Sequence, residues 1–390
     1  MYGLLNNQKI RNNAIQIIFV SMIVAVLLVS FLTAKANLDA QGITSGFGFF
    51  ERATGWDVSF SLLEFKPSDS YLRVLIVGFL NSLFVGAIAL SLATVFGVTV
   101  GAMRTSANAM ARLAGTMYVE TFRNVPLILQ LIFWYALLLE LPHPKKAAGL
   151  LGDNLFVSGR GIYLTGLNVN ALSAFLAIML FLVAAFLVVW IAKGKKFQKS
   201  EPENRRRLQW LTIGGAAVFI AVILYVGRIP ETEILNIPRL KGLNIKGGIR
   251  ATPELLACIV AITIYGTGYI AEIMRAGFNA VPKGQVEAGS AVGLRSGQIF
   301  WRIRLPLAVR TVMPTLINQY VWLFKATSIG IAVGFADYFF VISTSINQSG
   351  QTLELIALLM LGFLSVNYTI AWVLNRVNDA IKLKGTQNRA

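Results

Sequence analysis

Long stretches without a charged residue dominate the chain. They cover residues 12–34, 74–103, 161–192, 208–227 and 355–375. Each is longer than the roughly 18 apolar residues that indicate a helix crossing a lipid bilayer. Three further apolar segments, 113–139, 255–271 and 311–336, are shorter or contain one or two charges. The pattern therefore predicts an all-α integral membrane protein with about eight transmembrane helices.

The first apolar stretch has two interpretations. Lys9 and Arg11 precede it, and Ala34-Lys35-Ala36 resembles the cleavage site of a signal peptide. The apolar region of a signal peptide has about 7–15 residues, however, and this stretch is longer. Because seven further spans follow, we expect an uncleaved first transmembrane helix.

The composition agrees with a membrane protein and excludes several other classes. Apolar residues make up 56% of the chain and charged residues 14%, with a mean hydropathy of +0.65. Soluble domains carry about 25% charged residues. The single cysteine, Cys258, and the single histidine, His143, exclude a disulfide scaffold and a clustered zinc site. The sequence contains no glycine-rich phosphate loop, so we expect neither catalysis nor a cofactor or metal in this chain.

The formal charge of +17 is also found in nucleic-acid-binding proteins, but here the distribution of Lys and Arg favours membrane orientation. With the N-terminus inside, 21 of the 35 basic residues fall on the cytoplasmic side, 12 outside and two within spans. Both termini are therefore predicted to be cytoplasmic, although five basic residues between Arg228 and Arg250 lie outside. The basic segment 193–207 is interpreted as a stop-transfer signal near lipid headgroups, not as a nucleic-acid site.

One predicted cytoplasmic connection, residues 275–310, is longer and more patterned than the others. Residues 285–292 have helical composition, and Gly293 follows them as a residue suited to a left-handed helix end. A second short amphipathic piece covers residues 298–305, and we expect Pro306 to end it.

The motif residues of this loop resemble the EAA loop of bacterial ABC importer permeases. Glu287-Ala288-Gly289 is followed by Gly293 after three residues and by Ile303-Arg304-Leu305-Pro306 after nine more. The family pattern is E-A-A, three residues, G, nine residues and I-x-L-P, and Gly289 is the departure from it. Residues 78–83 resemble the start of the type-1 permease domain. Residues 120–127 with Gln130, and 325–328, are similar to its polar amino-acid branch.

The resemblance implies a domain organisation. Residues 1–70 would hold the first helix and a periplasmic segment. Residues 71–379 would form a type-1 ABC permease domain with an extra helix pair around 171–227, and residues 380–390 a cytoplasmic tail. The extra helices look like those of the general L-amino-acid permeases of Gram-negative bacteria.

The resemblance also implies partners and a coupling site. Such permeases span the inner membrane and work with two ATPase subunits, a second homologous permease, preferably as a heterodimer, and a periplasmic amino-acid-binding protein. The short helix of the loop docks on the ATPase: Ala288, Gly289 and Ala291 would permit close approach, and Glu287 would offer a charge. Gly293, Ile303, Leu305 and Pro306 complete the coupling motif. The alternative is an amphipathic helix on the membrane surface.

Polar residues inside predicted spans are pathway candidates, because charges in a bilayer are costly. Glu120 and Arg123 are spaced to pair with each other, either at a gate kinked by Pro126 or as a purely structural ion pair. Lys325, with Thr327 and Ser328, is suited to neutralise a substrate carboxylate, or to form a structural ion pair with Glu120 or a partner subunit. The remaining candidates, which are equally suited to interhelical hydrogen bonds, are Gln130, Thr267, Asn318 and Gln319.

The sequence thus predicts the permease subunit of an ATP-driven amino-acid importer. The alternative is a stand-alone secondary transporter or channel driven by an ion gradient. Such proteins often consist of two repeated halves, and the sequence shows no such repeat. A membrane-anchored sensor is disfavoured because no loop is long enough for a soluble domain.

Overall fold

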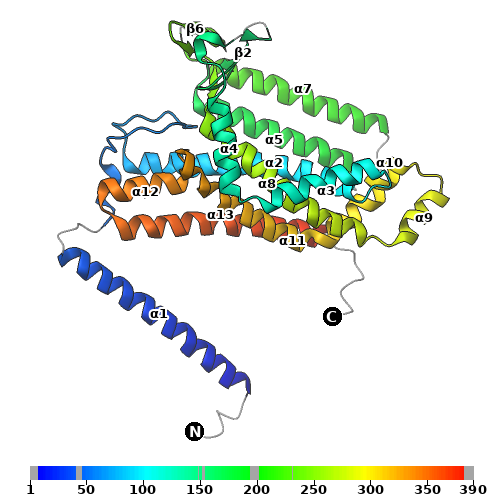
Figure 1. Ribbon diagram of the computed structural model, residues 1–390, viewed down its shortest axis with the longest axis horizontal. Coiled ribbons are helices and arrows are strands. Elements are labelled where there is room, and N and C mark those ends of the chain that lie inside the picture. The colour runs from blue at the N-terminus through cyan, green and yellow to red at the C-terminus, as the bar shows by residue number, and fades with distance from the viewer. Residues whose placement is uncertain are drawn as a thin grey trace. The chain divides into compact units, whose positions relative to one another are not determined.

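The computed structural model describes residues 8–40, 46–147, 149–151, 154–193, 202–230 and 232–381. Most of the basic segment 193–207 and all but the start of the predicted tail 380–390 lie outside these residues. The described part of the chain is mostly helical (Figure 1). An all-α membrane protein is therefore confirmed as the fold class.

Long helices account for most of the chain, and the order of elements follows the predicted spans. The helices are α1 (Gln8–Ala40), α2 (Tyr71–Arg104), α3 (Ala109–Asn124), α4 (Leu127–Leu139), α5 (Ala171–Lys193), α7 (Pro202–Val226), α8 (Pro253–Asn279), α9 (Lys283–Ala291), α10 (Ser296–Ile299), α11 (Leu305–Lys325), α12 (Tyr338–Ser349) and α13 (Thr352–Ile381). Shorter turns are η1 (Phe47–Glu51), η2 (Pro144–Lys146), η3 (Phe300–Arg304) and η4 (Ala326–Val333).

Within the described residues, five helices are long and apolar enough to cross a membrane, and two bent helix pairs raise this to as many as seven. The five are α1, α2, α7, α8 and α13. One bent pair is α3 with α4. The other runs from Ser296 through η4 into α12 and bends by 52°. The exact number of eight spans and the cytoplasmic placement of the termini stay predictions.

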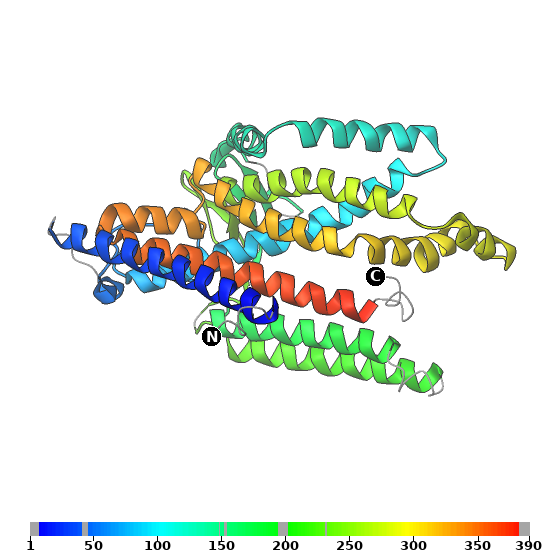
Figure 2. The same ribbon diagram turned by 90° about the horizontal axis from the view of Figure 1, so that it is seen from below.

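Residues of the chain form two compact units. The first combines residues 1–128 with 262–390, and the second consists of residues 129–261. The second unit contains the helix pair α5 and α7, which lie side by side in both ribbon views (Figures 1 and 2).

The second unit also contains small antiparallel sheets that the sequence did not predict. A four-stranded sheet has the order β1 (Gly149–Leu150), β2 (Leu155–Ser158), β3 (Gly161–Leu164) and β8 (Ile249–Ala251). Two strand pairs accompany it, β4 (Gly166–Leu167) with β5 (Leu235–Asn236), and β6 (Arg239–Lys241) with β7 (Asn244–Lys246). Phe156, Tyr163 and Ile245 form its buried apolar cluster. The apolar window 161–192 therefore begins in strand β3, and its helix starts only at Ala171.

Glycines on α2 bring this helix into direct contact with α8 in the first unit. A Cβ atom at Gly97 would lie 2.6 Å from Ile270 Cγ2, and one at Gly101 would lie 2.9 Å from the carbonyl oxygen of Ala271. Both distances are too short for a side chain, so the two backbones pack closely only because these positions are glycine. The close packing places Arg104, the last residue of α2, beside the final turns of α8.

Proline acts differently at two predicted helix boundaries. The predicted span 113–139 consists of two helices, because α3 ends at Asn124 and α4 begins after Pro126, in agreement with the expected disturbance. The expectation that Pro306 ends a helix was wrong. A π-helical turn, η3, precedes Pro306, and the Leu305 N–H donates to the carbonyl of Phe300. This wider turn changes the hydrogen-bond register before the proline, so the helix continues into α11.

Candidate functional site

Helix α9 lies at the centre of the patterned loop and ends as the sequence predicts. Gly293 has a φ of +81°, and its N–H donates to the carbonyl of Ser290 at 3.0 Å. The Leu294 N–H donates to the carbonyl of Gly289 at 3.1 Å. These two bonds form a Schellman motif, which satisfies the last carbonyls of the helix and requires a left-handed residue at Gly293.

The two parts of the loop motif, around Gly289 and around Ile303, pack against each other. A Cβ atom at Gly289 would lie 2.7 Å from Ile303 Cδ1 and 3.3 Å from Ile299 Cγ1. Gly289 is buried there, whereas Glu287 and Ala288 are exposed. Leu305 and Pro306 form the first turn of α11, directly after the turn that carries Ile303. The sequence spacing of the motif therefore places Gly289 and Ile303 in contact with each other within the chain.

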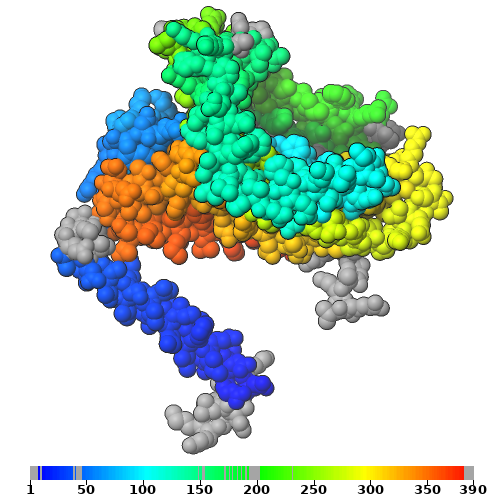
Figure 3. All heavy atoms as spheres, in the orientation of Figure 1, coloured from blue at the N-terminus to red at the C-terminus, as the bar shows by residue number. Residues whose placement is uncertain are grey.

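This packing corrects one expectation about the small residues of α9. Gly289 was expected to face a docking partner, but it faces the chain's own isoleucines, where there is no room for a methyl group without movement. Ala288 and Ala291 remain on the exposed side together with Glu287. The space-filling view shows the yellow atoms of this loop at the surface (Figure 3).

The ends of α2, α3 and α8 are joined by a group of charged side chains, here called the Glu272 network. It comprises Arg104, Glu120, Arg123, Glu272 and Arg275. Arg104 Nη1 donates to Glu272 Oε2, and Arg275 Nη2 donates to Glu272 Oε1 at 2.6 Å. Arg104 Nη2 lies 3.9 Å from Glu120 Oε1, and Arg123 Nη1 lies 3.9 Å from Glu272 Oε2.

The network corrects the predicted pairing of Glu120 with Arg123. Each of these two residues has its ion pair with a residue of another helix, Glu120 with Arg104 and Arg123 with Glu272. The guanidinium of Arg123 also lies 5.0 Å from the ring centroid of Tyr269, in a cation–π contact. Tertiary partners therefore replace the local pair on α3.

The polar residues predicted on α11 are exposed or half-buried. Asn318, Trp322 and Lys325 are all exposed, and their spacing places them on one helix face. The ring of Trp322 also packs against Tyr265 and Tyr269, at centroid distances of 5.6 and 5.9 Å. The side chain of Gln319 is half-buried.

The hydroxyl groups after Lys325 bond to the helix backbone. Thr327 is buried and its hydroxyl donates to the carbonyl of Phe324 at 2.9 Å, while Ser328 donates to the carbonyl of Lys325 at 2.8 Å. Both hydroxyl groups therefore stabilise the turn that follows α11. Thr267 is buried beside Tyr118. Gln130 is buried in the second unit.

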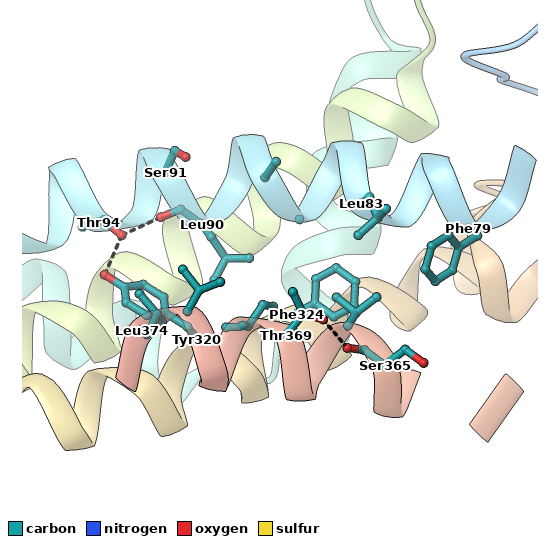
Figure 4. Close-up of a pocket in the computed structure, with 15 residues that line it drawn as sticks. Phe79, Leu83, Leu90, Ser91, Thr94, Tyr320, Phe324, Ser365, Thr369 and Leu374 are labelled. Atoms are coloured by element: carbon teal, nitrogen blue, oxygen red, sulfur yellow. Dashed lines mark hydrogen bonds between the residues drawn. The ribbon is translucent and has the colours of Figure 1, made fainter. Parts of the chain in front are cut away.

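An apolar cavity of about 650 Å³ lies between α2, α11 and α13 in the first unit (Figure 4). Three of its hydroxyl groups form hydrogen bonds within the chain: Thr94 and Tyr320 bond to each other at 2.9 Å, and Thr369 donates to the carbonyl of Ser365 at 2.7 Å. Among the described residues, those that line this cavity are different from the pathway candidates predicted above.

Sequence reasoning missed Arg104, Glu272, Arg275 and Tyr269. Arg104 and Glu272 were visible as the ends of the charge-free windows 74–103 and 255–271, and were interpreted as boundaries of spans. The signal that could have identified them is the glycine spacing of α2, since Gly97 and Gly101 bring the end of α2 against α8.

Known proteins are similar to this chain in sequence. Residues 93–382 match the family model described as "Binding-protein-dependent transport system inner membrane component". The chain therefore belongs to this family of membrane-embedded transport subunits, and it is a multi-pass inner-membrane protein. The resemblance inferred from the loop motif is confirmed.

Its individual relatives are permease proteins. The putative amino-acid ABC transporter permease protein YhdX of Escherichia coli K12 is 34% identical, with 97% of this chain and 95% of the relative covered. The general L-amino acid transport system permease protein AapQ of Rhizobium johnstonii is 31% identical, covering 94% and 92%. The glutamate/glutamine/aspartate/asparagine permease protein BztB of Rhodobacter capsulatus is 32% identical, covering 98% and 96%.

Proposed function

We propose that this chain is the permease subunit of an ATP-driven ABC importer and forms part of the pathway for L-amino acids across the inner membrane. Relatives similar over nearly their whole length are named as amino-acid permeases, which supports this substrate class. ATP is hydrolysed by separate subunits, and the chain itself is not an enzyme. Two ATPase subunits, a second homologous permease and a periplasmic amino-acid-binding protein complete the importer.

The observation that carries the proposal is the exposed face of α9. Glu287 and Ala288 point away from the chain, while Gly289 and the Schellman motif hold the helix in a fixed position against Ile303. A short helix that is held rigidly at its base and exposed at a charged face is suited to transmit the movement of a docked ATPase as a rigid body.

The exposed polar face of α11 supports a pathway role for Lys325. Asn318 and Lys325 lie on the outer face of a helix inside a predicted span, where lipid contact would be costly for both. Polar groups in this position face water or another protein subunit. A surface completed by a homologous permease would place the Lys325 ammonium group beside the carboxylate of a passing amino acid.

The substitution Glu287→Lys tests the coupling role. In proteoliposomes that contain the permeases and the ATPase, with ATP inside and the binding protein outside, we expect loss of ATP-driven amino-acid uptake, because the charge offered to the ATPase is reversed. Membrane insertion and the amount of folded permease should stay unchanged, since Glu287 is exposed.

Glu203→Lys is the matched control, because it makes the same charge change at an exposed position of α7, far along the chain from the loop. It should leave uptake unaltered. Normal uptake by the Glu287→Lys variant would contradict the proposed coupling. Uptake that persists without ATP and follows an ion gradient would favour the alternative of a secondary transporter.

A further inference from the structure

We infer that Glu272 is a positioning residue that links α9 to α3, so that displacement of the coupling loop reaches the polar end of α3. The inference rests on the proposed function, in which α9 is moved by an ATPase. It concerns residues that the loop motif and the pathway candidates do not include, namely Arg104, Glu272 and Arg275.

A continuous set of contacts leads from α9 to the Glu272 network. Gly289 of α9 packs on Ile303, and the next residue, Arg304, lies 5.7 Å from the ring centroid of Phe278 on α8. Arg304 Nη2 also lies 3.5 Å from the Thr105 hydroxyl, directly after Arg104. The base of the coupling loop thus contacts both helices that hold Glu272.

Glu272 lies between arginines from three helices. Its carboxylate accepts from Arg104 at the end of α2 and from Arg275 on its own helix, and faces Arg123 of α3. The side chain of Arg104 is only 9% exposed, so removal of the Glu272 charge would leave a buried cation with only its longer ion pair to Glu120, at 3.9 Å. Such a loss is strongly destabilising for the local arrangement.

The contacts within the network are of unequal length. Glu272 is joined to α2 and to Arg275 by direct hydrogen bonds. Helix α3 is joined through two longer pairs, Arg104 to Glu120 and Arg123 to Glu272, both at 3.9 Å. Charged groups at this longer separation lack a direct hydrogen bond, so within the network α3 is held less tightly than α2. Outside the network, the Tyr118 hydroxyl of α3 donates to the carbonyl of Ile264 on α8 at 2.9 Å.

The ends of α3 are suited to release from the network. The helix begins at Ala109, with four residues between it and the end of α2, and finishes at Asn124, before the break at Val125 and Pro126. Proline cannot continue the backbone hydrogen bonding of α3 into α4. Helix α3 is therefore a separate rigid segment held at its polar end by Glu272, and the network is the contact that would break or re-form as the importer changes state.

The test combines a distance measurement with a transport measurement in the assembled complex. Spin labels are placed at the exposed positions Met117 of α3 and Ala276 of α8, in a Cys258→Ala background. Double electron–electron resonance then gives the distance distribution without nucleotide. We expect one narrow distribution for the otherwise unaltered chain and a clearly broader one for Glu272→Gln and for Arg123→Gln.

The transport readout is amino-acid uptake per ATP hydrolysed. We expect Glu272→Gln to lower this ratio at least about tenfold. The double variant with Arg123→Gln should be no worse than Glu272→Gln alone, since both changes break the same contact. Arg112→Gln on α3 is the control, because the Arg112 guanidinium donates to the carbonyl of Ser106 and lies outside the network. It should change neither readout.

Two results would overturn the inference: an unchanged distance distribution in Glu272→Gln, or losses that multiply in the double variant. Size-exclusion profiles distinguish a misfolded variant from one that folds but has lost the Glu272 contact. The variant Glu272→Asp is a second control, because it keeps the charge and should retain most of the coupling. If the unaltered complex shows no ATP-driven uptake, the proposed function fails, whereas the distance distributions still decide whether Glu272 holds α3.

Discussion

The packing of α9 on Ile303 gives a sharp prediction at Gly289. A methyl group at this position would lie 2.7 Å from Ile303 Cδ1, which is the mobile end of a side chain and can move by a few tenths of an ångström. In Gly289→Ala the added methyl group crowds Ile303, but alanine stabilises the helical conformation of α9 by about 1 kcal/mol relative to glycine. We therefore expect its free energy of unfolding to lie within about 1 kcal/mol of that of the unaltered chain.

A larger side chain cannot be accommodated in the same way. Gly289→Leu would also meet Ile299, whose Cγ1 lies 3.3 Å from the first added carbon. Overpacking of this kind costs about 1–3 kcal/mol. The base of α9 would be displaced, so both thermal stability and affinity for the ATPase should fall.

The neighbouring residue provides the matched comparison. Ala288 is exposed, so Ala288→Leu should leave the free energy of unfolding unchanged while it obstructs the face that docks on the ATPase. If the binding free energy for the ATPase falls by about 1.4 kcal/mol, the affinity of the permease for the ATPase falls tenfold.

The assay is thermal unfolding of the purified permease in detergent, together with titration of the ATPase subunit onto the permease in nanodiscs. Equal losses of stability for Gly289→Leu and Ala288→Leu would refute the assigned orientation of α9. Unimpaired ATPase binding by Ala288→Leu would refute the docking face.

Three further predictions follow from the packing of the first unit. Gly97→Leu should destabilise the fold by about 1–3 kcal/mol or more in thermal unfolding, because the added Cβ would lie 2.6 Å from Ile270 Cγ2. The control Gly214→Leu should have little effect in the same measurement, because the space around Gly214 is open. Asn81→Ala should cost about 1–3 kcal/mol in the same measurement, since the buried amide of Asn81 donates to the carbonyls of Phe60 and Ala336 at 2.9 and 2.8 Å. Gly293→Ala should cost about 1–2 kcal/mol of α9 stability, seen as faster amide exchange in α9, because its φ of +81° is left-handed. Gly284→Ala is the control for this last change. Gly284 is not left-handed and alanine favours the helix, so exchange in α9 should not become faster.

The sequence was most informative where one physical requirement dominates. A bilayer demands long apolar segments, so the charge-free windows predicted most of the long helices. Gly293 was predicted as a helix end because a left-handed residue is nearly always glycine, and its φ agrees. The loop motif was recognisable because its residues keep a fixed spacing.

Prediction failed where the partner of a residue lies far away in the sequence. Glu120 and Arg123 are three residues apart, which favours a local pair, yet Arg104 and Glu272 provide their ion pairs across helix interfaces. Strands of two to four residues, such as β6, carry too little alternation to be detected. Pro306 was misjudged because a π-helical turn ahead of it changes the hydrogen-bond register.

The most direct test of the central claim is amino-acid uptake into proteoliposomes that contain this chain with its partner permease, ATPase and binding protein. The account predicts uptake that requires ATP hydrolysis, stops when the ATPase is inactivated, and is lost with Glu287→Lys in the permease. Uptake by this chain alone, driven by an ion gradient and unaffected by Glu287→Lys, would contradict it.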